Sequence, residues 1–204
     1  MDRKLVPSPT SPDVARFDRW AATYEQSRLQ NWIDVIHSRM LDLIARDGPK
    51  DPPGCIVDVG CGTGRLLRAA SARWPAARLS GVDPAPHMIE VARRLAPEGD
   101  FQVAPAEAIS FPDESADLVL SSVSFHHWAN QKKGLQQIAR VLRPEGWLCL
   151  ADHVILLMRL FGEKPKSRKQ IRALMTGVGL TVLQQQSMYM RVVAITLAQK
   201  EPGR

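Results

Sequence analysis

The alternation of short apolar runs with helix-like segments after residue 54 constrains this chain more than any other feature. Apolar runs that predict buried strands lie at residues 55–59, 78–82, 101–104, 117–120 and 147–151. Segments with helical spacing of apolar residues lie between them, at residues 65–73, 87–96 and 131–142. Strands that alternate with helices predict a mostly parallel sheet whose right-handed crossovers place helices on both faces.

The last third of the sequence adds a different connection. Residues 168–177 predict a helix, and residues 180–186 and 191–198 predict two further strands. The link between these strands is shorter than the dozen or more residues of a parallel crossover. We therefore expect an antiparallel hairpin at one edge of an α/β, Rossmann-like, doubly wound sheet of seven strands.

The segment before residue 55 has another character. Residues 1–13 are rich in proline and serine and predict a flexible arm. Within residues 14–47, apolar side chains recur at helical spacing at Ile33, Ile36, Met40, Leu43 and Ile44. Glycines and prolines between residues 48 and 54 end that helix. Since 204 residues suit one core, we expect a single domain over residues 48–204.

Composition excludes several classes of protein. No apolar run approaches the roughly 20 residues of a membrane span, and the first residues lack the apolar core of a secretory signal, so cytoplasm is the expected location. Cys55, Cys61 and Cys149 are too few and too scattered for a disulfide framework or a zinc site, and we expect reduced thiols and no metal. The net charge of +6 comes with arginines spread along the chain, which favours a solvated basic surface over nucleic-acid binding.

The stretch IVDVGCGTGRLL, residues 56–67, places three glycines directly after the first predicted strand. Such a loop lets a ligand approach the backbone at the carboxyl end of a strand, although it also serves as a plain tight turn. A P-loop is excluded because Gly64 is followed by Arg65 instead of Lys-Ser/Thr. Arg65 also occupies the third glycine position of a dinucleotide motif. A nucleoside remains, and Asp83 after the second strand can accept hydrogen bonds from both ribose hydroxyls.

Several motifs together resemble one enzyme family. DVGCGTG, GVDPAPHM, APAEAISFPDESADLVLSSVSFHHW and GLQQIARVLRPEGWLCL resemble motifs of class I S-adenosylmethionine-dependent methyltransferases of the small type 11 family, which includes the ubiquinone and menaquinone C-methyltransferases. FDRWAATYEQS resembles the segment that closes over the cofactor in several members. The resemblance implies a methyltransferase catalytic domain over residues 48–204, with residues 14–47 forming N-terminal helices or a flap over the active site.

The resemblance also implies which residues bind S-adenosylmethionine and its product S-adenosylhomocysteine. The implied cofactor-binding residues are Asp58, Gly60, Cys61, Gly62, Gly64, Asp83, Pro84, Met88, Ala106 and Ser122. Asp58 would hold the methionine ammonium, and Asp83 the ribose hydroxyls. Pro84 and Met88 would pack on the adenine, whose edge would meet the Ala106 backbone. Ser122 would lie near the reacting sulfonium.

Two positions depart from the family pattern. Pro105 replaces an acidic residue that usually accepts from the adenine amino group, and proline offers neither an N–H nor a side-chain acceptor. Glu107 either compensates or is a solvated surface carboxylate. Ala85 stands where a serine often caps the next helix, a loss of about 1 kcal/mol that Pro86 at the first helical position partly offsets. Neither change excludes cofactor binding.

Methyl transfer is an in-line displacement in which proximity and orientation do most of the work, so a base is needed only if the acceptor loses a proton. His126 and His127, after the fourth strand, are the candidate bases, and each also has a plain structural interpretation. Tyr24 is a further catalytic candidate on the N-terminal segment, where Trp20 is expected to pack on an apolar face.

The expected acceptor is a small molecule, bound between the N-terminal helices and residues 153–167. Residues 162–169, GEKPKSRK, either contact an anionic acceptor or form a solvated loop. Two alternatives stay open: a cofactor-binding protein without turnover, and a methyltransferase acting on RNA or protein. The strand end LSSVSFHHW lacks the Asn/Asp-Pro-Pro-aromatic motif that stacks a flipped base, which weakens the nucleic-acid alternative. A homodimer is compatible with the sequence.

Overall fold

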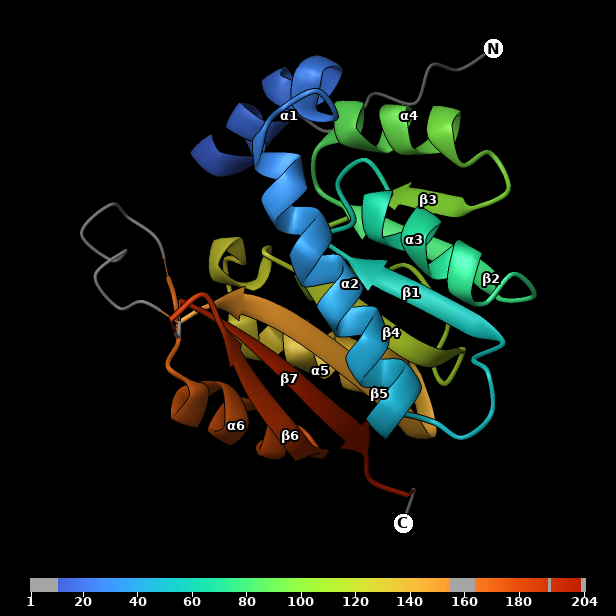
Figure 1. Ribbon diagram of the computed structural model, residues 1–204, viewed down its shortest axis with the longest axis vertical. Coiled ribbons are helices and arrows are strands. Elements are labelled where there is room, and N and C mark those ends of the chain that lie inside the picture. The colour runs from blue at the N-terminus through green and yellow to red at the C-terminus, as the bar shows by residue number, and fades with distance from the viewer. Residues whose placement is uncertain (1–10, 155–163, 191, 203–204) are drawn as a thin grey trace.

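The computed structural model describes residues 11–154, 164–190 and 192–202, and these residues form the expected seven-stranded sheet (Figure 1). Its strands are β1 (Cys55–Val59), β2 (Arg78–Asp83), β3 (Asp100–Val103), β4 (Ala116–Ser122), β5 (Leu142–His153), β6 (Leu180–Met188) and β7 (Val193–Lys200). They lie in the order β3-β2-β1-β4-β5-β7-β6. Strands β1 to β5 pair in parallel, whereas β7 is antiparallel to both β5 and β6. The predicted fold class and antiparallel hairpin are confirmed.

Helices cover both faces of the sheet because side chains alternate along each strand. Helices α2 (Leu29–Asp47), α3 (Arg65–Arg73) and α4 (Pro86–Leu95) pack on one face, in a cluster that contains Ile56, Leu118 and Leu120. Helices α5 (Gln131–Val141) and α6 (Arg168–Thr176) pack on the other face, in a cluster that contains Val57 and Val119. Figure 1 shows α2 and α3 in front of the sheet and α5 behind it.

Residues 143–146 lie in the first part of β5, although their Arg-Pro-Glu-Gly sequence is typical of a turn. The register between β4 and β5 shifts after the pair Ala116–Leu142 and resumes at Leu118–Trp147. Glu145 takes a left-handed backbone conformation with φ of 62° inside this irregular stretch. The Arg143 side chain donates to Asp117 on β4 and holds the irregular stretch against the neighbouring strand. The chain therefore reverses there through an irregularity in the strand, which the Pro-Glu-Gly pattern did not reveal.

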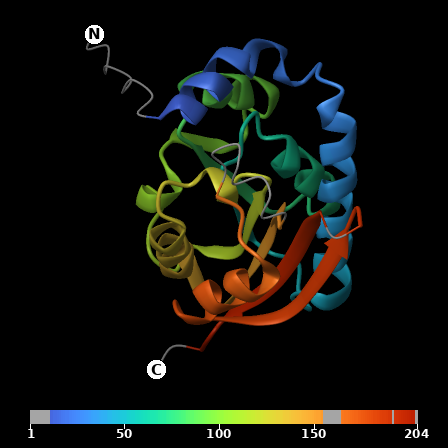
Figure 2. The ribbon, with the colours of Figure 1, turned by 90° about the vertical axis from the view of Figure 1, so that its left-hand side faces the viewer.

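Helix α1 (Pro12–Tyr24) lies beside α4, as Figures 1 and 2 both show. Its Ser11 side chain accepts from the Val14 N–H and caps the helix, so residues 11–13 of the segment predicted as a flexible arm belong to this helix and its cap. Residues 1–10 of that segment lie outside the described part. Ala21 and Phe17 pack against Ala85 and Met88 in a third, small apolar cluster. Helix α1 is thereby placed over the carboxyl ends of β1 and β2.

No helix among the described residues is long and apolar enough to cross a membrane. The three cysteines are buried and free, as expected. Within the described part of the chain, no group of three or more histidine, cysteine or acidic side chains is arranged to hold a metal ion.

Candidate cofactor-binding and active site

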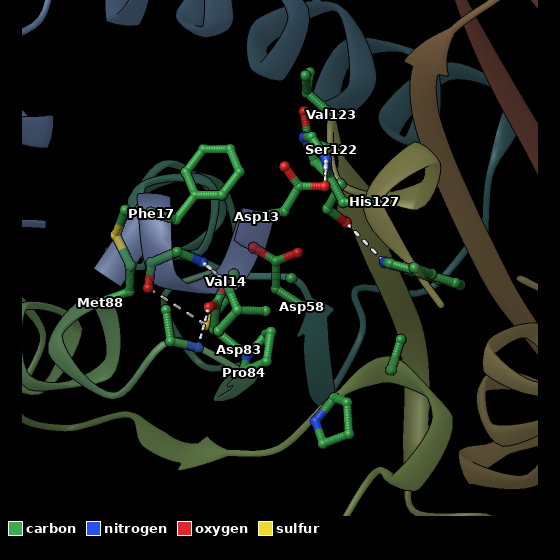
Figure 3. Close-up of a pocket in the computed structure, with 18 of the residues that line it drawn as sticks. Asp13, Val14, Phe17, Asp58, Asp83, Pro84, Met88, Ser122, Val123 and His127 are labelled. Atoms are coloured by element: carbon green, nitrogen blue, oxygen red, sulfur yellow. Dashed lines mark hydrogen bonds and ion pairs between the residues drawn. The ribbon is translucent and has the colours of Figure 1, made fainter. Parts of the chain in front are cut away.

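A cavity of about 380 Å³ opens at the carboxyl ends of β1, β2 and β4 and is covered by α1 and α2. Doubly wound sheets bind ligands at the carboxyl ends of their strands, where the strand order reverses. In this sheet the order reverses between β1 and β4, beside the cavity. Twelve of the thirteen residues predicted from the sequence line it: Tyr24, Asp58, Gly60, Cys61, Gly62, Asp83, Pro84, Met88, Ala106, Ser122, His126 and His127. Figure 3 shows Asp58 near the middle of this group, with Asp83 and Met88 on one side and Ser122 and His127 on the other.

The thirteenth residue, Gly64, does not line the cavity. It precedes α3 with a φ of 76°, and a Cβ added there would lie 3.1 Å from the Phe101 ring. Gly62 differs, because an added Cβ would meet no atom within 4 Å at its φ of 52°. Gly60 packs against the Ser124 side chain, which leaves no room for a Cβ. Of the three glycines, Gly62 is thus the one whose missing side chain leaves space within the loop.

Asp83 ties the glycine loop to the end of β2. One carboxylate oxygen accepts from the Gly62 N–H and the other from the Ala85 N–H, each at 2.9 Å. Burial raises the pKa of Asp83 to about 6 despite these two donors. Each oxygen still has a lone pair for a further donor, so the side chain can orient the loop and accept from a ligand hydroxyl at the same time.

Asp58 and Ser122 bring unsatisfied oxygen atoms to the same cavity. Asp58 Oδ1 and Ser122 Oγ are buried and have no hydrogen-bond partner. Burial, with a smaller contribution from the charge of Asp83, raises the pKa of Asp58 to about 8. Buried polar atoms are normally hydrogen-bonded, and a carboxylate in an apolar site is most readily charged beside a cation. A ligand that carries an ammonium group fits this position.

The adenine side of the expected site is apolar. Pro84, Met88, Pro105 and Ala106 line it, and Met88 is buried against α1. Glu107 also lines the cavity, but its Oε1 accepts from the Asn130 N–H at 2.7 Å, just before α5. Through this oxygen Glu107 ties the loop to the start of α5, and its side chain lines the cavity beside Pro105.

His126 and His127 each have a carboxylate partner that the sequence did not reveal. His126 is buried, and its Nδ1 lies 2.5 Å from Oδ1 of Asp152, at the end of β5. His127 Nδ1 lies 3.4 Å from Oδ2 of Asp13, on α1, as Figure 3 shows. The two imidazole rings lie 3.9 Å apart between their centroids. Both partners are distant in the chain, so only the folded sheet and the docked α1 bring them to the histidines.

The N-terminal helices contribute more to the cavity than expected. Asp13, Val14 and Phe17 line it together with Tyr24, whose pKa is raised by burial. Trp20 does not line it and packs edge-on against the Tyr24 ring, as expected for an apolar contact.

A network of charges joins the turn after α1 to the glycine loop. Glu25 accepts from Thr63, from Arg65 at 2.7 Å and from Arg68 at 2.9 Å. Arg65 also donates through two nitrogens to Asp34 of α2. Burial opposes the ionisation of Glu25, but the Thr63 hydroxyl and Arg68 outweigh it and lower its pKa. Arg65, the residue that argued against a dinucleotide motif, thus links the N-terminal helices to the glycine loop after β1.

Helix α4 receives its N-terminal cap from α1. The Ala85 side chain makes no cap, as expected, but Asp18 Oδ1 accepts from the His87 N–H at 2.8 Å. Asp18 Oδ2 lies 2.7 Å from His87 Nδ1, and this contact raises the pKa of His87. A side chain 69 positions away therefore supplies the cap whose loss the local sequence predicts.

The loop after β5 is described only in part. Residues 155–163 lie outside the described residues. They make up most of the segment 153–167 that is predicted to bind the acceptor, and they include the first two residues of the basic stretch 162–169. Lys164 lines the cavity, and its carbonyl accepts from Gln131 Nε2 at 2.9 Å.

Comparison with known proteins supports the family resemblance. Residues 57–150 match the family model described as a methyltransferase domain. The chain is 34% identical over 138 residues to an uncharacterized methyltransferase-like protein of Schizosaccharomyces pombe, covering 68% of this chain and 51% of that protein. It is 36% identical to the demethylmenaquinone methyltransferase of Thermus thermophilus, covering 56% of this chain and 52% of that enzyme. The chain thus spans about half the length of these curated relatives.

Solved structures show the same fold. A chain from the complex between the Haloferax volcanii Trm112 methyltransferase activator and a methyltransferase superposes with a TM-score of 0.78 at 22% identity, covering 91% of this chain and 97% of that one. The [4+2]-cyclase SpnF superposes with a TM-score of 0.72 at 19% identity, covering 81% of each chain. The second likeness is to a cyclase, so activity must be argued from the site.

Proposed function

We propose, because residues 57–150 carry a methyltransferase domain, that this protein transfers the methyl group of S-adenosylmethionine to a small-molecule acceptor. The observation that carries the proposal is the convergence of Asp58, Gly62, Asp83 and Ser122 on one cavity at the strand ends. Two of the curated relatives, trans-aconitate 2-methyltransferase of Streptomyces coelicolor and demethylmenaquinone methyltransferase of Thermus thermophilus, are named for small-molecule acceptors.

The residues present fit this cofactor. Asp58 Oδ1 and Ser122 Oγ are buried without partners, and Gly62 leaves open space. Asp58 would hold the methionine ammonium, Asp83 would accept from the ribose hydroxyls, and Pro84 and Met88 would pack on the adenine. When bound, the cofactor supplies an electrophilic methyl group on a sulfonium.

The protein's own contribution is to orient the reactants and, for an acceptor that loses a proton, to accept that proton. His126 would take this role at Nε2, since Asp152 engages its Nδ1. Asp152 is then a positioning residue that fixes the ring. His127 and Tyr24 line the same cavity and would border the acceptor. Helices α1 and α2 would act as a flap that excludes water, because they supply the residues that cover the strand ends.

Calorimetric titration tests the proposal. S-adenosylmethionine and S-adenosylhomocysteine should both bind the purified protein, and methyl-labelled cofactor should pass its label to a member of a small-molecule panel. An absence of heat and of any thermal shift with either compound would overturn the proposal. Binding of both without transfer to any panel member would favour the cofactor-binding protein without turnover.

A further inference from the structure

Helix α2 presents two polar residues to the cavity that no cofactor contact uses. Gln30, Ile33 and His37 lie on one face of the helix at a spacing of three and four residues, and all three line the cavity. Gln30 is 2% exposed and His37 is 6% exposed. A polar pair at this depth needs hydrogen-bond partners.

Each of the two side chains has an atom without a partner. Gln30 Nε2 donates to the Tyr24 carbonyl at 3.0 Å, which turns its Oε1 away with no donor. His37 Nδ1 is also buried and unpartnered. Burial, assisted by the charge of Arg65 and opposed by Asp34, lowers the pKa of His37 to about 4. At neutral pH the pair is therefore an uncharged acceptor oxygen and a neutral imidazole nitrogen.

These atoms come from α2, whereas the residues assigned to the cofactor come from β1, β2, β4 and the loops that follow them. We propose that Gln30 and His37 form the acceptor subsite and hold an uncharged hydroxyl group of the methyl acceptor. This inference rests on the proposed function and adds the chemical class of the acceptor to it.

The charges around the pair select against ionised groups. A carboxylate has no hydrogen to donate to Gln30 Oε1 and would meet its lone pairs. The charge of Arg65 is already balanced by Glu25 and Asp34, to which it donates. Lys164 is the other lysine or arginine among the described lining residues, and its Nζ points to the Ala129 carbonyl at 3.5 Å.

An ammonium group is disfavoured for a different reason. Burial penalises a positive charge at His37 by more than the nearby carboxylates of Asp34 and Glu25 favour one, which is why the pKa of His37 is lowered. A hydroxyl both donates and accepts, so with the proton of His37 on Nδ1 it can accept from that nitrogen and donate to Gln30 Oε1.

The test uses matched probes on the full chain saturated with S-adenosylhomocysteine. The probes are 4-methylphenol, 4-methylbenzoate and 4-methylbenzylamine, which are similar in size and differ in charge at pH 7. Binding is followed by NMR shift titration. The variants are Gln30→Met, His37→Phe and His37→Asn, which keeps a polar atom near the Nδ1 position. Ile36→Val is the control, since Ile36 is buried on α2 and does not line the cavity.

The phenol should bind more tightly than the benzoate or the amine. Gln30→Met and His37→Phe should each weaken phenol binding by about tenfold, His37→Asn should retain most of it, and Ile36→Val should leave it unchanged. S-adenosylhomocysteine affinity should stay within about threefold of wild type in all variants.

Tighter binding of a charged probe, or phenol affinity that is unchanged by both Gln30→Met and His37→Phe, would overturn the inference while leaving the cofactor site intact. An equal loss of S-adenosylhomocysteine affinity would assign the pair to the donor. Failure of the wild type to bind S-adenosylhomocysteine would instead refute the proposed function.

Discussion

At the scale of single residues, the site is defined by two buried carboxylates at the ends of neighbouring strands. Asp58 on β1 has no partner for its Oδ1, while Asp83 on β2 accepts from two backbone N–H groups. Both have raised pKa values because of burial, to about 8 for Asp58 and about 6 for Asp83. The same chemical group therefore has two different states near neutral pH, set by its local donors.

The raised pKa of Asp58 makes stability depend on pH. Between about pH 4 and pH 8, the folded protein holds a proton on Asp58 that the unfolded chain has lost. The free energy of unfolding should therefore fall as pH rises through this range, and Asp83 adds to the fall between about pH 4 and pH 6. Urea unfolding at pH 6 and pH 8 measures the effect of Asp58. Asp58→Asn has no titratable side chain at this position, so its free energy of unfolding should fall less between pH 6 and pH 8 than that of wild type. An equal fall in both proteins would contradict the assignment of this effect to Asp58.

Replacement of Asp83 should remove the ribose contact and loosen the glycine loop together. Asp83→Ala should abolish detectable S-adenosylhomocysteine binding in calorimetry, since both the Gly62 and Ala85 N–H groups lose their acceptor. Asp83→Asn retains one acceptor oxygen and should bind with intermediate affinity. Asp100→Ala, an exposed aspartate on β3, serves as the control and should match wild type. Unchanged affinity in Asp83→Ala would remove the ribose from this position.

Substitution of the histidines should separate binding from catalysis. His126→Ala should lower turnover by about 10²-fold to 10⁴-fold if the acceptor loses a proton. His127→Ala, at a residue that would border the acceptor, should lower turnover less, and both variants should lose less cofactor affinity than turnover. Asp152→Asn should alter the pH profile of the rate because it changes the partner of His126 Nδ1. The rates require an acceptor identified with labelled cofactor. A purely structural pair would instead show parallel losses of stability and cofactor affinity.

The cavity-lining residues that are expected to bind the cofactor could be predicted from sequence, because they lie in short motifs that follow the strand ends. Asp13, Gln30 and His37, which line the cavity from the N-terminal helices, and Asp152, which contacts His126, could not, because each comes from a segment distant from those motifs. The signal for Gln30 and His37 was present as polar residues on the buried face of an amphipathic helix.

At the scale of elements, α1 and α4 act as a pair. Asp18 caps α4 across 69 residues and also pairs with His87, so one side chain serves both helices. This explains how α4 begins without a capping side chain at Ala85. Local propensity predicted the helix, but its cap came from tertiary structure.

Loss of Asp18 should weaken both helices. Asp18→Ala should lower stability by about 1 kcal/mol, the usual value of an N-cap, and increase hydrogen exchange in α1 and at the start of α4. Asp18→Asn keeps an oxygen for the His87 N–H and should lose less. Asp42→Ala, on α2, removes an exposed ion pair with Arg73 of α3 and provides the control. Exchange that rises equally in all three variants would argue against the cap.

At the scale of the whole molecule, the sheet was predictable and the covering helices were only partly so. Apolar runs and their spacing predicted the strands and the antiparallel hairpin, because burial on both faces leaves a continuous apolar signal. The docking of α1 combines the small apolar cluster around Met88 with polar contacts such as Asp18–His87 and, just after the helix, Glu25–Arg65. Such contacts join segments about 40 to 70 residues apart and leave no periodic trace in the sequence.

Helix α1 supplies Asp13, Val14 and Phe17 to the cavity, yet among the described residues neither of the two large apolar clusters contains a residue of α1. We therefore expect the sheet and the two large clusters to stay folded if α1 detaches. In that state the chain is folded but the binding site is incomplete, so a measured dissociation constant combines intrinsic affinity with the equilibrium for α1 docking. A substitution on the outer surface of α1, far from any ligand atom, would then change apparent affinity without altering a single ligand contact.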